Sequence, residues 1–512
     1  MRSERGPRWP YARMACLTAV LACGIARAQA PGGTQAPAPP PPPPPPVPNV
    51  TPTQPSVPTP VPPTITDPGA PGVVPSAPVN SSAAPVGEGN MEDLARPRAE
   101  SAAGGGVPTA ATAAEEAAAE KPEPTLLMKW LGMEESQVKV YGWIENSITG
   151  NANGRGNGQN FGVTPNFLAD TWMGNQYYLI FEKPLEQNDT INFGFRSDNL
   201  FGNDWAFNHA RGYGDTITKS EGFGGYDPAQ YYGEVHLPFI TEGGIDVKAG
   251  RWYTILGYEQ VPATSRPLIS VPYMFNYGQP FTHLGVMTTT HVTDKLNWYN
   301  GTINGWDRGW DQRYELGYIG GINYTFNEDK TNLAVSYVWG PNQFPSFIPP
   351  GQNIQPTGTP ITPAQFAGVR NTYYSHAYRN MFTSVLTHKW SDKLTEVMET
   401  DQGWEQNVPF VNGKLRRQDV GWYSFGNWFL YQFHEKLTGV WRAEVFWDQS
   451  GVRTGTSGGR FYEQTLGLIY KPKSWLWIRS EARYDWSQFV SPYTAGTRNS
   501  QFTYGLDVIF LF

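Results

Sequence analysis

Apolar and polar side chains alternate, one residue at a time, in short segments all the way from residue 138 to residue 512. The segments 191–196 (INFGFR), 441–448 (WRAEVFWD) and 476–485 (LWIRSEARYD) show the pattern. Side chains of a β-strand point alternately to its two faces, so each segment is predicted to be a strand with one apolar and one polar face. The chain is therefore expected to be all-β. Alternation alone is consistent with a two-sheet sandwich or with a closed barrel.

Three further features favour a transmembrane antiparallel β-barrel. Many segments are about ten residues long, the length that a tilted strand needs to cross a bilayer, and aromatic side chains gather near their ends. Short connections such as 188–190 and 391–392 alternate with long ones at 198–228, 340–372 and 488–500. Short turns on one rim and long loops on the other are typical of outer-membrane barrels, and closure leaves no unpaired backbone edge in the lipid.

The last segment carries the most specific sign. Its alternate residues are apolar and the chain ends on an aromatic side chain: Phe502, Tyr504, Leu506, Val508, Phe510 and Phe512. This pattern resembles the assembly signal of bacterial outer-membrane barrels. An ordinary last strand of a soluble protein would expose the same apolar stripe to water.

About sixteen strands are expected, within a range of about fourteen to eighteen, because single-chain bacterial barrels have even strand numbers. The candidate ranges are 138–150, 176–183, 190–197, 230–238, 245–253, 282–293, 295–305, 315–326, 331–339, 380–389, 393–404, 418–433, 437–449, 460–471, 475–487 and 502–512. A barrel of this width is too wide for its own side chains to fill. An aqueous lumen is therefore expected unless loops close it.

Residues 1–30 are predicted to be a signal peptide. Four arginines precede an apolar stretch at 14–25, and small residues follow at cleavage spacing. The sequence 20–23 (VLAC) also resembles a lipoprotein cleavage box, which leucine at position 21 fits poorly. Cleavage removes both cysteines and changes the net charge from −7 to −11. The mature chain then has no disulfide, and its acidic balance argues against nucleic-acid binding and favours cations in a pore.

Residues 31–124 are predicted to be a disordered periplasmic linker rich in proline and alanine. They contain 26 of the chain's 46 prolines and no Phe, Tyr or Trp, so they cannot bury a core. Two interpretations stay open: a semi-rigid spacer, or an arm that docks on the cell wall or another partner. The next residues, 125–137, are expected to hold a short amphipathic helix that acts as a plug or lies at the membrane interface.

From residue 138 to residue 512 the chain resembles the OmpL-like, porin-2 type family of outer-membrane β-barrels. The resemblance is clearest in three stretches, 250–259 (GRWYTILGYE), 279–286 (QPFTHLGV) and 304–307 (NGWD). It implies a pore in the bacterial outer membrane and little about the solute. The proline-rich segment is not part of the common family pattern.

Charged side chains on the predicted inner faces are the candidate pore-lining residues. They are Arg196, Asp246, Lys248, Arg442, Glu444, Asp448, Arg479, Glu481, Arg483 and Asp485, with Glu182 beside them. Such side chains line the water column of a channel and set its ion preference, and their mixed signs predict weak selectivity. The alternative is a ladder of cross-strand ion pairs that stiffens the wall, and the two roles can coexist.

Two features of the predicted loops carry alternatives. The proline-rich loop 340–372 is expected either to fold inward as a constriction or to lie at the surface. The loop tryptophans Trp205, Trp306, Trp310 and Trp404 are a candidate stacking track for sugars. Otherwise they belong to the interfacial belt or pack within the loops.

No catalytic, metal or cofactor site is predicted. The seven histidines are scattered without His-Glu-x-x-His spacing, and no Gly-x-Ser-x-Gly elbow occurs. The glycine-rich run 154–158 follows a strand but precedes no helix, so it is interpreted as a flexible loop rather than a phosphate cradle.

These features predict an outer-membrane porin: a passive aqueous channel for small hydrophilic solutes or ions. Its surroundings would be membrane lipid, its proline-rich segment would lie in the periplasm, and its oligomeric state stays open. The alternative is a non-conducting structural barrel that anchors the outer membrane to the cell wall through the proline-rich segment. A barrel enzyme would need Ser, His and Asp clustered at the rim.

Overall fold

The computed structural model describes residues 124–154, 158–210, 224–310, 315–341, 378–411 and 414–512. The predicted signal peptide and linker lie outside these residues, as does most of the loop 340–372. All of the described residues belong to one structural unit, Gly87–Phe512.

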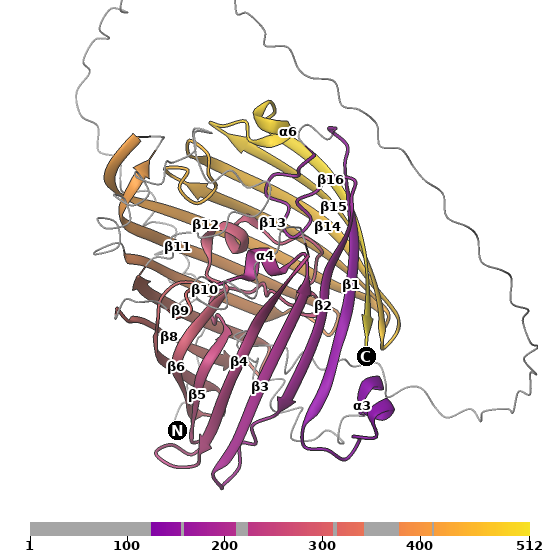
Figure 1. The fold of residues 1–512 in the computed structure, drawn as a ribbon, viewed down its shortest axis with the longest axis vertical. Helices are drawn as coiled ribbons and strands as arrows, with labels where there is room; N and C mark the ends of the chain where they lie inside the picture. The colour runs from indigo at the N-terminus through magenta and orange to yellow at the C-terminus, as the bar shows by residue number, and fades with distance from the viewer. Residues whose placement is uncertain (1–123, 155–157, 211–223, 311–314, 342–377, 412–413) are drawn as a thin grey trace, which may run out of the picture. The chain divides into compact units, whose positions relative to one another are not determined.

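Sixteen antiparallel strands close into a barrel (Figure 1). They are β1 (Lys139–Asn151), β2 (Trp172–Lys183), β3 (Asn192–Gly202), β4 (Gly225–Leu237), β5 (Ile245–Tyr253), β6 (Thr282–Thr293), β7 (Leu296–Ile303), β8 (Gly317–Phe326), β9 (Thr331–Pro341), β10 (Tyr378–Lys389), β11 (Leu394–Val411), β12 (Lys414–His434), β13 (Leu437–Asp448), β14 (Gly459–Lys473), β15 (Leu476–Gln488) and β16 (Ser500–Leu511). β1 pairs with β2 on one side and with β16 on the other, so every strand has two neighbours. The predicted all-β barrel of sixteen strands is confirmed.

The alternating pattern separates an apolar outer face from a polar interior. On β16, Tyr504 and Leu506 are exposed on the outside, whereas Gln501, Thr503 and Asp507 are buried inside. The apolar outer residues suit a lipid-facing surface. The buried polar residues must find hydrogen-bond partners within the barrel.

Several strand ends differ from the sequence prediction, and at β2 a bulge that interrupts the alternation explains the difference. β2 begins at Trp172, four residues before its predicted start, and the consecutive residues Asn175 and Gln176 are both buried where the register with β1 shifts. β3 continues to Gly202 through a register shift after Asp198, within residues that are predicted to be loop. At β2 the pattern of every second residue is lost while the pairing continues, whereas β3 keeps its alternation and the extra residue lies on β4.

Connections are short at one rim of the barrel and long at the other. β6 and β7, β12 and β13, and β14 and β15 are each joined by two residues, whereas β5 and β6 are joined by residues 254–281. Short helices lie in the long connections: α4 (Trp205–Asn208), η1 (Ala263–Ser265), η2 (Met274–Gly278) and α6 (Tyr493–Gly496). Only the long-loop rim therefore has enough chain to build a site.

One helix, α3 (Leu126–Leu131), precedes the barrel and lies beside the start of β1 (Figure 1). The Thr125 hydroxyl accepts a hydrogen bond from the Met128 N–H (3.3 Å) and donates one to the Val140 carbonyl (3.0 Å), which fixes the helix to the barrel. Trp130 is 81% exposed. An exposed tryptophan at the short-turn rim fits an interfacial element better than a plug. Among the described residues, no helix combines the length and the apolar character needed to cross a membrane.

Candidate functional site: a segment inside the barrel

The connection 254–281, here called the inner segment, folds into the barrel interior (Figure 1). Prolines at 262, 267, 272 and 280 prevent it from pairing as a strand, and it has only two charged side chains. Leu256, Val271 and Tyr273 have no exposed surface. Such an apolar segment is more stable inside the barrel than on its rim, because water is excluded from its side chains.

Two carboxylates of the barrel wall bind the backbone N–H groups of the inner segment. Glu444 on β13 accepts hydrogen bonds from the Tyr273 N–H and from the Met274 N–H (3.1 Å to the latter). Glu481 on β15 accepts from the N–H groups of residues 269 (2.9 Å) and 270 (3.0 Å). These groups have no strand partner, so the wall supplies the acceptors that buried N–H groups require.

Three arginines of the same wall bind the segment's carbonyl groups. Each guanidinium reaches a different stretch: Arg442 donates to Ser270 (2.7 Å), Arg479 to Ala263 (2.9 Å) and Arg266 (2.8 Å), and Arg483 to Val271 (2.7 Å). Arginine suits this role because its fork of fixed donors can hold a carbonyl and a carboxylate at once.

Each of these arginines also pairs with a carboxylate on a neighbouring strand or on its own strand. The pairs are Arg442 with Glu463 (2.6 Å), Arg479 with Asp507 (2.5 Å) and Arg483 with Asp485 (2.8 Å). All six side chains are buried. The structure thus places five of the predicted pore-lining residues, Arg442, Glu444, Arg479, Glu481 and Arg483, on the inner face, where they bind the inner segment rather than a column of water. Asp485 lies on the same face but contacts Arg483 and Gln501 instead.

The two charged side chains of the inner segment also find partners on the wall. Glu259 accepts a hydrogen bond from the Trp428 indole (3.1 Å) and lies 3.3 Å from Arg442. Burial raises the pKa of Glu259, and the positive charge of Arg442 partly offsets this effect. Arg266 lies 3.7 Å from both Glu145 and Asp204.

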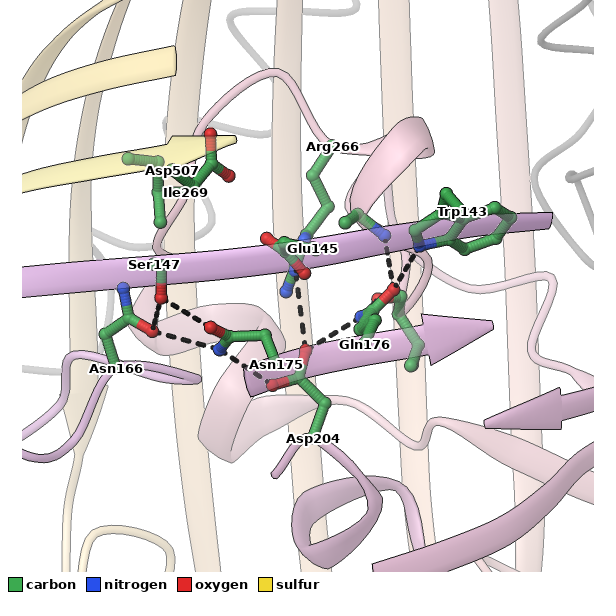
Figure 2. Close-up of polar contacts among 12 residues, drawn as sticks. Trp143, Glu145, Ser147, Asn166, Asn175, Gln176, Asp204, Arg266, Ile269 and Asp507 are labelled. Carbon is green, nitrogen blue, oxygen red and sulfur yellow. Dashed lines mark hydrogen bonds and ion pairs between the residues drawn. The ribbon is translucent and has the colours of Figure 1, made fainter. Parts of the chain in front are cut away.

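A polar network joins the inner segment to β1, β2 and two other long connections (Figure 2). The Gln176 amide donates to the Val261 carbonyl (2.8 Å) and to Asp204 (2.7 Å), while its oxygen accepts from the Trp143 indole (3.0 Å). Asn175 donates to Asn166 (3.0 Å), which lies in the connection between β1 and β2, and to Asp204 (3.0 Å). Burial raises the pKa of Asp204, and Arg266 counteracts it.

The opposite wall contacts the other end of the inner segment. Glu399 on β11 accepts hydrogen bonds from the Tyr258 N–H (3.1 Å) and from the Gln279 amide (2.5 Å), and Asp401 accepts a second one from Gln279 (2.9 Å). Ile255 and Leu256 belong to one apolar cluster with wall residues that include Met287, Ile303, Val338 and Met381. The inner segment therefore spans the lumen between two walls.

The stretches that carry the family resemblance are the places where the inner segment enters, turns and leaves. Gly257 has a φ of +85°, and a Cβ there would meet the Gln279 side chain. Asp307 accepts hydrogen bonds from the N–H groups of Phe281 (2.7 Å) and Thr282 (3.0 Å) and so fixes the exit into β6. Burial raises the pKa of Asp307.

The remaining predicted residues do not bind the inner segment. Arg196 pairs with Asp198 (2.7 Å) and lies 3.7 Å from Glu182. Lys248 pairs with Glu234 (3.6 Å), and Asp246 contacts two histidines, His236 (2.6 Å) and His291 (2.9 Å). Lys248 and Asp246 keep 20% and 13% of their side chains exposed. Asp448 instead accepts backbone hydrogen bonds within the connection between β13 and β14.

Sequence reasoning missed the inner segment and considered 340–372 as the inward loop. Most of that loop lies outside the described residues. A signal for the true segment exists: residues 254–281 are longer than a turn, apolar and nearly free of charge. Of the candidate stacking tryptophans, Trp205 and Trp306 are buried in the connections, whereas Trp310 and Trp404 are exposed. The first two therefore cannot form an open track. In the described part of the chain, no three metal-ligating side chains lie close enough to hold an ion.

One family of known proteins matches the part of the chain that forms the barrel. The sequence pattern of the family described as "Putative beta-barrel porin-2, OmpL-like" matches residues 137–512. No curated protein matches the chain. Similar solved structures include the anion-selective porin of Comamonas acidovorans (9% identity, 73% of this chain and 99% of that chain, TM-score 0.47) and the outer-membrane channel DcaP of Acinetobacter baumannii (10%, 73% and 97%, 0.46). A third is OprB of Pseudomonas putida (11%, 77% and 99%, 0.45).

The family match covers the same residues that close the sixteen-strand barrel, including the stretches that position the inner segment. The outer face of this barrel is the apolar surface that a lipid bilayer requires. The chain therefore belongs to the OmpL-like β-barrel porin-2 family of the bacterial outer membrane.

Proposed function

We propose that the barrel is a passive pore for small hydrophilic solutes or ions and that the inner segment forms its narrowest section. The observation that carries this proposal is the placement of residues 254–281 across the lumen, bound by charged side chains of two walls. A sixteen-strand barrel without such a segment would be wide and unselective. The segment reduces the open cross-section and brings polar walls close to any solute.

Partly exposed inner side chains suggest where solutes pass. Lys248 and Asp246 on β5 reach water, and they lie on the wall that makes no ionic contact with the inner segment. At the short-turn rim, a pocket of about 290 Å³ lies between the ends of β11 and β14, and its lining includes the charged residues Asp392, Lys393, Glu435, Lys436 and Lys471. In this proposal solutes diffuse down their gradient between the inner segment and the β3–β6 wall, and side-chain charge tunes the rate.

Planar-bilayer conductance of the detergent-folded protein tests the proposal. Discrete, long-lived current steps are expected from protein whose folded state is established by its heat-dependent gel mobility. A silent membrane with folded protein would contradict the open pore.

The burial of the inner segment also favours a second candidate, a closed structural barrel that anchors the membrane to the cell wall through residues 31–124. In that case the bilayer stays silent, and the full-length protein co-sediments with purified peptidoglycan while protein lacking residues 31–124 does not. A conducting barrel with no peptidoglycan binding would exclude this candidate.

A further inference from the structure

Two arginines stack on two buried tryptophans at the long-loop rim. The Arg453 guanidinium lies 4.9 Å from the Trp422 ring centre and 5.6 Å from that of Trp306, and Arg379 lies 4.9 Å from Trp306. The two rings meet edge to face at 6.1 Å. These four residues are here called the arginine–tryptophan cluster. Trp306 lies in the connection between β7 and β8, Arg379 on β10, Trp422 on β12, and Arg453 in the connection between β13 and β14. Aromatic faces attract cations and hold both guanidinium planes in place.

Arg453 is fixed in its position from both sides. The Asp448 carboxylate accepts hydrogen bonds from the N–H groups of Gly451 (2.9 Å), Arg453 (2.9 Å) and Thr454 (2.8 Å), which sets the shape of the connection. The Arg453 Nε–H donates to the Tyr277 carbonyl of the inner segment (2.5 Å). The guanidinium is therefore held directly above the constriction before any solute arrives.

The two arginines differ in how their charge is balanced. Arg379 donates from Nε (3.0 Å) and Nη2 (2.8 Å) to one oxygen of Glu405. Arg453 has no carboxylate within 4 Å among the described residues, and its two terminal nitrogens make no hydrogen bond to any of them. The side chain is only partly covered, so these nitrogens can receive a solute. Burial and the repulsion from Arg379 lower the pKa of Arg453 to about 9, although the more distant carboxylates Glu405, Asp448 and Asp307 partly offset the effect.

We propose that the arginine–tryptophan cluster is a binding site for the oxyanion group of a small solute, a carboxylate or a phosphate, above the inner segment. The two terminal N–H groups of Arg453 form the fork that binds two oxygens of such a group, and Arg379 adds positive potential. Binding places a negative group in direct contact with the Arg453 guanidinium, which none of the described carboxylates does. The site therefore attracts anions at the long-loop end of the barrel, although the net charge of the whole chain is negative. This inference rests on the proposed function, because a solute bound at the cluster would lie at the entrance to the proposed constriction.

Fluorescence titration tests binding independently of transport, since Trp306 and Trp422 lie under the site. Sodium phosphate and sodium acetate are titrated separately into the folded protein at constant ionic strength, with sodium chloride as the reference. A saturable change with at least one of the two oxyanions and not with chloride is expected. Which of the two binds more tightly identifies the oxyanion class. Equal responses to all three salts would overturn the proposal.

The variant Arg453→Gln keeps an N–H that can bind the Tyr277 carbonyl but removes the charge and the fork. It is expected to weaken oxyanion binding at least tenfold. The matched control is Arg460→Gln, because Arg460 stacks on Trp447 (5.0 Å) at the exposed outer face and should leave binding unchanged. A loss of binding in both variants, or in neither, contradicts the assignment.

Conductance in a salt gradient separates this inference from the proposed function. If the pore conducts, Arg453→Gln should shift the reversal potential toward cation preference relative to the wild type, and Arg460→Gln should not. Conduction with an unchanged reversal potential and no oxyanion-dependent fluorescence overturns the site while the pore stands. A silent barrel that still binds phosphate or acetate overturns the pore and supports the site.

Discussion

The two halves of the inner wall use the same alternating pattern in different ways. On β13–β15, arginines and carboxylates are fully buried and hold the backbone of the inner segment. On β3–β6, Arg196 and Asp198 are also buried but pair with each other and not with the inner segment, and Lys248 and Asp246 remain partly exposed. A polar inner face therefore does not by itself mean a water-filled lumen. What a charge contributes depends on whether a folded segment covers it.

This difference has an energetic consequence. In a buried ion pair, the attraction between the two charges offsets their lost hydration. Removal of one partner therefore leaves a buried charge without compensation, which is strongly destabilising. A partly exposed pair is screened by water and contributes little. Substitutions of buried pairs and of partly exposed residues should therefore separate into structural and functional effects.

The largest expected effect is on stability, from Arg442→Leu. This change removes the partner of Glu463 and Glu259 and a hydrogen-bond donor to the inner segment. It should lower the free energy of unfolding by about 3–5 kcal/mol. The matched variant Lys248→Leu on the other wall should lower the free energy of unfolding by less than about 1 kcal/mol. Urea unfolding of both variants in lipid vesicles measures the difference. Equal losses would mean that the two walls do not differ in this way.

A second prediction concerns the carboxylates that hold the inner segment. The two oxygens of Glu444 bind separate N–H groups, whereas a single oxygen of Glu481 binds both of its N–H groups. Glu444→Gln must turn an NH₂ group toward one backbone N–H, while Glu481→Gln can keep both bonds through its amide oxygen. We expect Glu444→Gln to loosen the segment and raise single-channel conductance or current noise more than Glu481→Gln. The reverse order would show that charge, and not hydrogen-bond geometry, holds the segment.

The barrel could be predicted from the sequence because lipid on one side of each strand and polar groups on the other impose a strict period of two. The inner segment could not, because its apolar side chains have no period and its prolines look like an ordinary loop. Residues such as Arg442 and Glu481 could be placed on the inner face simply because every second residue of a strand points to the same side. Their partners are backbone groups about 170 to 210 residues away in the chain, and no local pattern encodes such contacts. At β2, a bulge removed even the local signal.

A smaller effect is expected from pH at the arginine–tryptophan cluster. Because the pKa of Arg453 is lowered to about 9, its guanidinium is charged at neutral pH and loses its proton as the pH rises through about 9. Oxyanion binding needs the charged form and should weaken between pH 8 and pH 10. Fluorescence titrations across that range measure this, and Arg453→Gln should show no such dependence. Binding that is constant to pH 10 would contradict a lowered pKa of Arg453.

The smallest effects should come from the two partly exposed charged residues on β5, Lys248 and Asp246, and they sharpen the comparison of the two walls. If solutes pass along this wall, Lys248→Gln should shift the reversal potential in a salt gradient toward cations, and Asp246→Asn should shift it toward anions. Each shift should be modest, because water screens both side chains. Neither variant should change single-channel conductance as much as Glu444→Gln. Shifts of opposite sign with unchanged stability would place the solute path on this wall, whereas no shift in either variant would place it elsewhere in the lumen.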